Sequence, residues 1–334
     1  MRKVSAVRLE DHDDLARGFG VALRQVPGLL PVSLPKQVVI KPNLCDITAW
    51  ETGVTTDPRW IEVLARELRS VRPDVQIRVV ESDAISAYKS YRSCDETFER
   101  LGFVSAAREA GIDLVNLSRA ESIEIRLDDV PLPIRIPQLL LEEFYFISIA
   151  NLKVHPYTRM TGTLKNSLGL LSDPDISSLH PYLSILISRI YRLCSPDLCI
   201  IDGRIGLEGK GPILGDLVRM NTLLVGSDAL AVDQAASQLM GISPDAVPHL
   251  RQVAGDAGLK LGEVEIVGDF QPRPFVFGAA KAFPSIVAKF ASRRIHSRME
   301  DFSRRWIDRA FRFKDDPRAF ARSAVRKLTK SRPS

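Results

Sequence analysis

Short apolar runs alternate along the chain with longer stretches in which apolar residues recur every three or four positions. The short runs predict β-strands, and the longer stretches predict amphipathic helices. The expected strands cover residues 4–9, 38–42, 76–80, 113–117, 144–152, 198–202, 221–226 and 264–267. The expected helices cover residues 14–25, 58–71, 95–111, 181–194 and 229–240. Strands that alternate with helices predict an α/β fold with a mainly parallel sheet and helices on both faces.

The region 123–137 departs from this alternation because it contains Pro131, Pro133 and Pro137. Proline cannot donate to a sheet ladder, so this region is expected to form a hairpin or an excursion at a sheet edge. We expect residues 1–271 to form one α/β domain that holds the ligand site. A short second lobe over residues 113–148 is an alternative within that domain.

The charge of the chain is unevenly distributed. Residues 272–334 contain 17 Lys and Arg against 5 Asp and Glu, whereas residues 1–271 contain 29 against 36. Phe302, Trp306 and Phe313 recur at helical spacing among arginines, which predicts a helical basic C-terminal extension whose end is disordered. This extension either packs on the body or binds a polyanion non-specifically. The polyanion would be a membrane surface or RNA. No zinc finger or aromatic stacking motif supports sequence-specific nucleic-acid binding.

The N-terminal sequence MRKVSAVRLEDHDDLARG meets charge within ten residues and has no apolar signal-peptide core. No apolar run approaches the roughly 20 residues of a membrane helix, so a cytoplasmic protein is expected. Its four cysteines are Cys45, Cys94, Cys194 and Cys199. Their spacing matches no compact zinc or iron–sulfur motif, so an iron–sulfur cluster is not expected.

Polar residues stand at the ends of five predicted strands. They are Lys41 and Asn43, then Glu81 and Asp83, then Asn151, Lys153 and His155, and finally Asp202 and Asp228. Each residue alone is typical of a turn or a helix cap. Ligands of an open parallel sheet bind beyond the carboxyl ends of its strands, so five such ends predict one shared site for an anionic ligand.

The segment NLKVHPYTRMTGTLKNSLG, residues 151–169, holds the highest density of polar groups. Its second half resembles a loop that opens a helix, where backbone N–H groups and the hydroxyls of Thr161 and Thr163 can hold a phosphate or carboxylate. Lys165 would supply the positive charge. The spacing is not that of a Walker A loop, and a solvated loop with a capped helix is the alternative.

Two further segments are candidates for ligand contact. DGRIGLEGKGPILG, residues 202–215, contains five glycines, which predicts tight turning or a close backbone approach to a ligand at Gly209 and Gly211. Thr56 lies in TTDP, residues 55–58, which is equally typical of a plain helix N-cap and of a ligand contact.

Six motifs occur in a recognisable order. They are IKPN (40–43), TTDP (55–58), NLKVH (151–155), TGTLKNSLG (161–169), DGRIGLEGKGP (202–212) and GSDALAVD (226–233). Together they resemble the domain-of-unknown-function family 362 over residues 36–269. The resemblance implies the fold and the site but no reaction, because the family is largely uncharacterised. Many of its members carry ferredoxin-like cysteine clusters, and C-x-x-C-x-x-C is absent here.

The leading hypothesis is an enzyme that acts on a small carboxylate or phosphate metabolite by lysine and histidine acid–base chemistry. A lysine crowded by other cations has a lowered pKa, and histidine titrates near neutrality. The expected catalytic residues are Lys41, His155 and Lys165. The expected ligand-binding residues are Asn43, Thr56, Asn151, Lys153, Thr161, Thr163, Asn166, Gly209 and Gly211.

Two alternatives remain open. The first is a metal-dependent or redox enzyme, in which Glu81, Asp202 and Asp228 bind a divalent metal such as magnesium or manganese. The second is a non-catalytic accessory protein that its basic extension recruits to a membrane or to RNA. A serine hydrolase is disfavoured because no G-x-S-x-G motif occurs.

Overall fold

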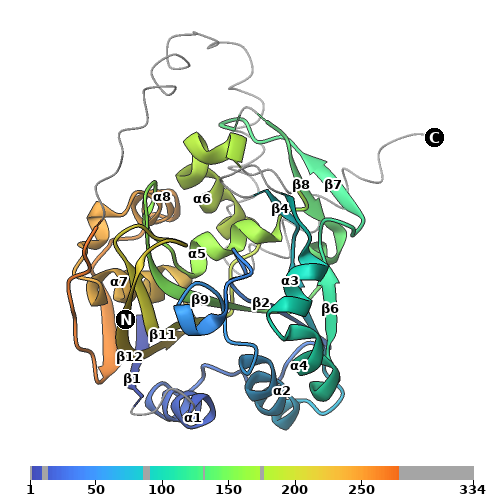
Figure 1. The fold of residues 1–334 in the computed structure, drawn as a ribbon, viewed down its shortest axis with the longest axis horizontal. Helices are drawn as coiled ribbons and strands as arrows, with labels where there is room; N and C mark the ends of the chain where they lie inside the picture. Colours follow the sequence, from blue (N-terminus) through green and yellow to red (C-terminus); the bar gives the residue numbers. More distant parts are fainter. Residues whose placement is uncertain (1, 10–13, 86–90, 131, 174–176, 278–334) are drawn as a thin grey trace.

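A nine-stranded sheet forms the centre of the protein (Figure 1). The computed structural model describes residues 2–9, 14–85, 91–130, 132–173 and 177–277. Its strands are β1 (Arg2–Arg8), β2 (Gln37–Lys41), β3 (Gln76–Glu81), β4 (Ala84–Ile85), β5 (Tyr91–Arg92), β6 (Asp113–Asn116), β7 (Ser122–Ile125), β8 (Ile134–Pro137), β9 (Tyr145–His155), β10 (Arg159–Met160), β11 (Leu198–Glu208), β12 (Asp216–Gly226) and β13 (Val264–Gly268). Its α-helices are α1 (Leu15–Gln25), α2 (Trp60–Val71), α3 (Cys94–Arg100), α4 (Phe103–Ala110), α5 (Thr163–Asn166), α6 (Leu183–Leu193), α7 (Ala229–Leu239) and α8 (Pro248–Ala257).

The sheet is mostly parallel, as the sequence predicts. Its order is β13–β1–β12–β11–β9–β2–β3–β6, with β10 paired to β9. The block β11–β9–β2–β3–β6 is parallel throughout. Strand β12 is antiparallel to both of its neighbours, β11 and β1. The carboxyl ends of β11, β9, β2 and β3 therefore lie at one edge of the sheet, and the carboxyl end of β12 lies at the opposite edge.

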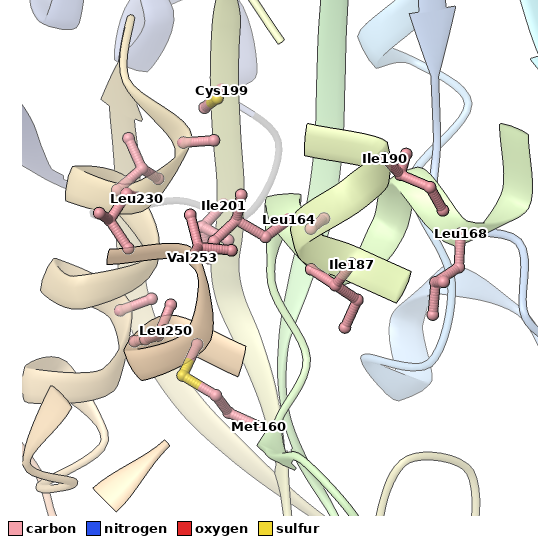
Figure 2. Packing of buried hydrophobic residues seen from close by; sticks show 14 of the residues in the cluster. Met160, Leu164, Leu168, Ile187, Ile190, Cys199, Ile201, Leu230, Leu250 and Val253 are labelled. Atoms are coloured by element: carbon pink, nitrogen blue, oxygen red, sulfur yellow. The ribbon is translucent and has the colours of Figure 1, made fainter. Parts of the chain in front are cut away.

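The strand period of two produces a core on each face of the sheet. In β9, Ile147 and Ile149 join a core with α1 and α2, whereas Phe146 and Ala150 join a core with α6, α7 and α8. Figure 1 shows α1 and α2 on one side of the sheet and α6 and α8 on the other. In Figure 2, Leu164 of α5 lies within the second core together with Ile187 and Ile201. The helix layers on both faces confirm the predicted α/β class.

Several predicted elements differ in extent. The expected helix 95–111 is divided into α3 and α4, because Gly102 adopts the left-handed conformation with φ of 79°. Helix α8 was not predicted. Strands β9 and β11 each run for 11 residues and so continue beyond their predicted ends. Both extensions carry residues that the sequence assigned to ligand loops.

The proline-rich region forms the predicted hairpin. Strands β7 and β8 pair with each other in a separate two-stranded sheet. Ile134 and Ile136 of β8 are buried in the same core as α6, so the hairpin packs on the body. The body continues past residue 271, because Phe275 is buried and Gly209 forms a bridge with Phe277. Residues 278–334 of the basic extension lie outside the described residues. Among the helices that the structure describes, none is long and apolar enough to cross a membrane.

Candidate functional site

The predicted site residues of β2, β3 and β9 meet at the carboxyl edge of the parallel block. Strand β9 runs beside β2, with Lys41 opposite Ser148, and beside β11, with Asp202 opposite Asn151. Beyond the sheet, β9 continues to His155 and returns through β10. The chain then crosses back through α5, which brings Lys165 and Asn166 to the same edge.

Asn43 and Asn166 connect these segments by hydrogen bonds. The Asn166 amide donates to the carbonyl oxygens of Lys41 and Ile149, at 2.9 and 3.1 Å. Asn43 Nδ2 lies 3.5 Å from Asn166 Oδ1, and Asn43 N donates to the Thr56 hydroxyl at 2.8 Å. Asn151 Nδ2 donates to Thr55 O at 3.0 Å. The segments predicted to share a site are therefore physically joined, and these amides are occupied in holding them together.

The Lys41 ammonium forms a buried ion pair with Glu81. Its Nζ lies 2.6 Å from Glu81 Oε2 and 2.7 Å from Pro42 O, and the lysine is 1% exposed. Gly169 packs against this ion pair, since a Cβ there would lie 2.6 Å from Glu81 Oε1. The ion pair joins the ends of β2 and β3, and the catalytic role expected of Lys41 stays a prediction.

Lys153 is also fully engaged. Its Nζ donates to Asn43 Oδ1 at 2.5 Å, to Val54 O at 2.7 Å and to Cys45 Sγ at 3.2 Å. An ammonium has three donors, and all three are used here. No carboxylate is among these three partners, and the charge of Lys153 lowers the pKa of Lys165. It therefore acts on neighbouring groups as a fixed charge.

The predicted anion cradle at the start of α5 is filled by the protein's own carboxylate. Asp233 of α7 accepts hydrogen bonds from Thr163 N at 2.7 Å, Thr163 Oγ1 at 2.8 Å and Leu164 N at 3.0 Å. Burial raises the pKa of Asp233 to about 7 against the effect of these hydrogen bonds. Thr161 is occupied too, because its hydroxyl donates to Asn151 O at 2.8 Å. The hydroxyls of Thr161 and Thr163 thus make hydrogen bonds within the chain, and the ligand roles expected of them stay a prediction.

Lys165 differs from the other two lysines of the site. Among the described residues it has no hydrogen-bond or ion-pair partner, and part of its side chain remains open to solvent. Burial lowers the pKa of Lys165 to about 8; Cys45 opposes this shift and Lys153 reinforces it. At neutral pH the amine can therefore both carry charge and exchange a proton.

His155 is held as a neutral imidazole. Its Nδ1 accepts hydrogen bonds from Tyr157 N at 3.3 Å and Thr158 N at 3.2 Å. Burial, followed by the charge of Lys165, holds the pKa of His155 well below its ordinary value. Because Nδ1 accepts two backbone N–H groups, the ring proton resides on Nε2. His155 is thus suited to donate a hydrogen bond from Nε2, and less suited to the general acid–base role predicted for it.

The expected three-carboxylate metal site does not form. Asp202 accepts from Trp60 Nε1 at 2.9 Å and pairs with Arg204 at 2.8 Å, and the same Arg204 nitrogen bonds Asp57 at 2.7 Å. Asp228 lies at the opposite sheet edge, where it pairs with Arg2 at 3.0 Å and caps α7. Glu81 is bound to Lys41. Within the described ranges, no group of three or more His, Cys, Asp or Glu residues is arranged to hold a metal ion.

The glycine-rich segment forms an antiparallel hairpin in place of the expected ligand loop. Strands β11 and β12 pair up to Glu208 and Asp216, and Gly209 and Gly211 lie in the connection. Gly209 has φ of 74°, and its N–H donates to Val276 O at 2.7 Å. Gly211 packs on β9, where a Cβ would lie 2.5 Å from Val154 O. The positive φ of Gly209 and the close approach of Gly211 to β9 therefore explain why glycine stands at both positions.

Three important residues carried little signal in the sequence. Cys45 was assigned no role, although its Sγ accepts a hydrogen bond from Lys153 Nζ. Asp233 was one of several carboxylates within a motif, and its capping of α5 depends on contact across 70 residues of chain. His249 lies in the unpredicted helix α8 and is 0% exposed, and neither of its ring nitrogens has a hydrogen-bond partner within the described part of the chain.

Comparisons with known proteins identify the family. A curated relative, the thylakoid-associated protein sll1697 of Synechocystis sp., is 24% identical over 124 residues, which are 35% of this chain and 39% of the relative. The chain therefore spans about two fifths of the length of that relative. The structure of the lactate racemase apoprotein from Thermoanaerobacterium thermosaccharolyticum matches with a TM-score of 0.41 and 12% identity, over 72% of this chain and 58% of that one. The profile described as "Domain of unknown function (DUF362)" matches residues 38–238, which lie inside the predicted range and exceed half of the chain, so the protein belongs to the DUF362 family.

Proposed function

We propose that the protein is an enzyme that transfers a proton to or from a small metabolite bearing a carboxylate or phosphate group. The observation that supports this most is the state of Lys165. It is the one of the three site lysines without a partner among the described residues, and burial brings its pKa to about 8. A base with a pKa near the working pH is effective in proton transfer.

The residues around Lys165 support distinct roles. Lys153 supplies a fixed positive charge that attracts the anion and lowers the proton affinity of Lys165. His155 Nε2–H would donate a hydrogen bond to the substrate oxygen on which negative charge develops, as a neutral imidazole can. Asp233 and Asn166 hold the α5 segment that carries Lys165. The proposal needs no metal from the three carboxylates that were predicted to bind one.

A proton-transfer enzyme exchanges an acidic C–H of its substrate with solvent. The test is to incubate the full-length protein in D2O with a panel of small carboxylates and phosphate esters and to record deuterium uptake by NMR. The wild-type protein should label one class of compound. Lys165→Met should abolish labelling, because the exchanging amine is removed.

Lys260 provides the matched control, since it is an exposed lysine on the same protein. Lys260→Met should label at the wild-type rate. Labelling that persists in Lys165→Met, or a panel in which no compound is labelled, would contradict the proposal. Comparing the thermal unfolding of both variants separates loss of chemistry from loss of fold.

A further inference from the structure

His249 is an unusual residue for a protein core. It is 0% exposed, and neither Nδ1 nor Nε2 has a hydrogen-bond partner among the described residues. An unpartnered buried polar group costs free energy, so such groups are rare without a ligand, an ordered water or a functional reason. The neighbouring residues of α8, Leu250 and Val253, are well packed in the core, as Figure 2 shows.

The position of His249 relates it to the candidate site. Helix α8 packs against α6 and α7, and Leu250 shares a core with Met160 and Leu164, which flank the turn from β10 into α5. Burial lowers the pKa of His249 to about 3, and the charge of Lys165 lowers it further. His249 in turn contributes to the low pKa of His155. Lys165 thus has a neutral imidazole near it from β9 and another from α8.

The hydrogen-bonding capacity of these groups restricts the ligand. His155 offers one donor, Nε2–H, because its Nδ1 is occupied. His249 offers one donor and one acceptor, because a neutral imidazole has one of each and both of its nitrogens are unpartnered. A bare anion has only acceptors, so it would satisfy the ammonium and the donors but leave the acceptor nitrogen of His249 unsatisfied.

We propose that His249 is a ligand-binding residue of the Lys165 site and selects an oxyanion that carries an O–H group beside its charged oxygens. A hydroxy-carboxylate and a protonated phosphate share this chemistry. The anion would bind to Lys165, and its O–H would donate to the unprotonated nitrogen of His249. This inference rests on the proposed function, since it places the substrate of that function on Lys165.

Two pairs of probes isolate the O–H group. Inorganic phosphate carries a P–OH at neutral pH and sulfate carries none; glycolate carries a hydroxyl that acetate lacks. Affinities would be measured by calorimetric titration of the full-length protein at pH 7. We expect the member with the O–H group to bind on the order of tenfold to a hundredfold more tightly, the usual effect of leaving a buried polar atom unpaired.

Three variants assign the preference to His249. His249→Phe should bind sulfate as the wild type does but lose the preference for phosphate over sulfate and for glycolate over acetate. It should unfold at the same temperature or higher, because it removes an unpartnered polar group from the core. His249→Gln should keep part of the preference, since its amide retains a donor and an acceptor. Lys165→Met should weaken all four probes.

The outcomes separate the two proposals. If all four anions bind through Lys165 without a preference for O–H, the inference about His249 is overturned while the anion site stands. The same holds if His249→Phe keeps the wild-type preference, in which case His249 contacts only a buried water. If the wild-type protein does not bind phosphate, or if Lys165→Met binds phosphate as tightly as the wild type does, both this inference and the anion site of the proposed function fail. A preference for glycolate alone or for phosphate alone identifies which of the two sources supplies the O–H group.

Discussion

Breaking the buried ion pair between Lys41 and Glu81 should destabilise the protein strongly. The two charged atoms lie 2.6 Å apart, and both side chains are nearly inaccessible to solvent. At an effective dielectric constant of about 20, Coulomb's law gives roughly 6 kcal/mol of attraction at this distance. Much of this attraction only offsets the cost of desolvating the two charges. Each single variant, Lys41→Met or Glu81→Leu, leaves the other charge buried and unpaired, so each should lower the free energy of unfolding by about 3–5 kcal/mol.

The double variant Lys41→Met, Glu81→Leu leaves no unpaired charge. Its loss of stability should therefore be smaller than the sum of the single losses, with a coupling energy of about 3 kcal/mol. Urea unfolding at pH 7 of the four proteins measures this cycle. The exposed pair Lys3–Glu265, at 3.3 Å, is the control and should show a coupling below about 1 kcal/mol. Equal coupling in the two cycles would refute the assignment of Lys41 as a neutralised structural lysine.

Two further predictions follow from the α5 segment. Because the pKa of Lys165 is about 8, its ammonium form predominates below pH 8, and the affinity for sulfate should fall about tenfold per pH unit above pH 8. The variant Lys165→Arg stays charged and should show no such decline. Calorimetric titrations from pH 7 to 9.5 measure both affinities. A parallel decline in both proteins would exclude Lys165 as the group responsible. Gly162→Ala places a Cβ 2.4 Å from Asp233 Oδ2 and should cost about 1–3 kcal/mol of unfolding free energy in urea. The helical Gly255, which has nothing within 4 Å of such a Cβ, is the control, and Gly255→Ala should instead stabilise the protein by about 0.5–1 kcal/mol.

The sequence by itself determined the main elements of the sheet and the family. The apolar runs at residues 38–42 and 76–80 are short and bounded by polar residues, so they read as strands without reference to the rest of the chain. The polar residues at the ends of β2 and β9 were recognisable for the same reason. A parallel sheet then requires those ends to lie at one edge, which is where the structure has them.

Only the tertiary structure decided which of these polar residues remain available. Lys41, Lys153 and Lys165 look alike in the sequence, and they differ because Glu81 neutralises the first and Asn43 with Val54 O engages the second. The sequence predicted an external anion at the start of α5, whereas the backbone N–H groups there donate to the side chain of Asp233.

The remaining differences have a common physical cause. Asp228 was placed in the site because it follows a strand, and the antiparallel direction of β12 moves it to the opposite edge. His249 gave no signal, since a histidine in a helix acquires its meaning only from what surrounds its ring. Local periodicity reports the conformation of a segment, whereas charge neutralisation and hydrogen-bond satisfaction depend on partners that the fold brings from 40 to more than 100 residues away.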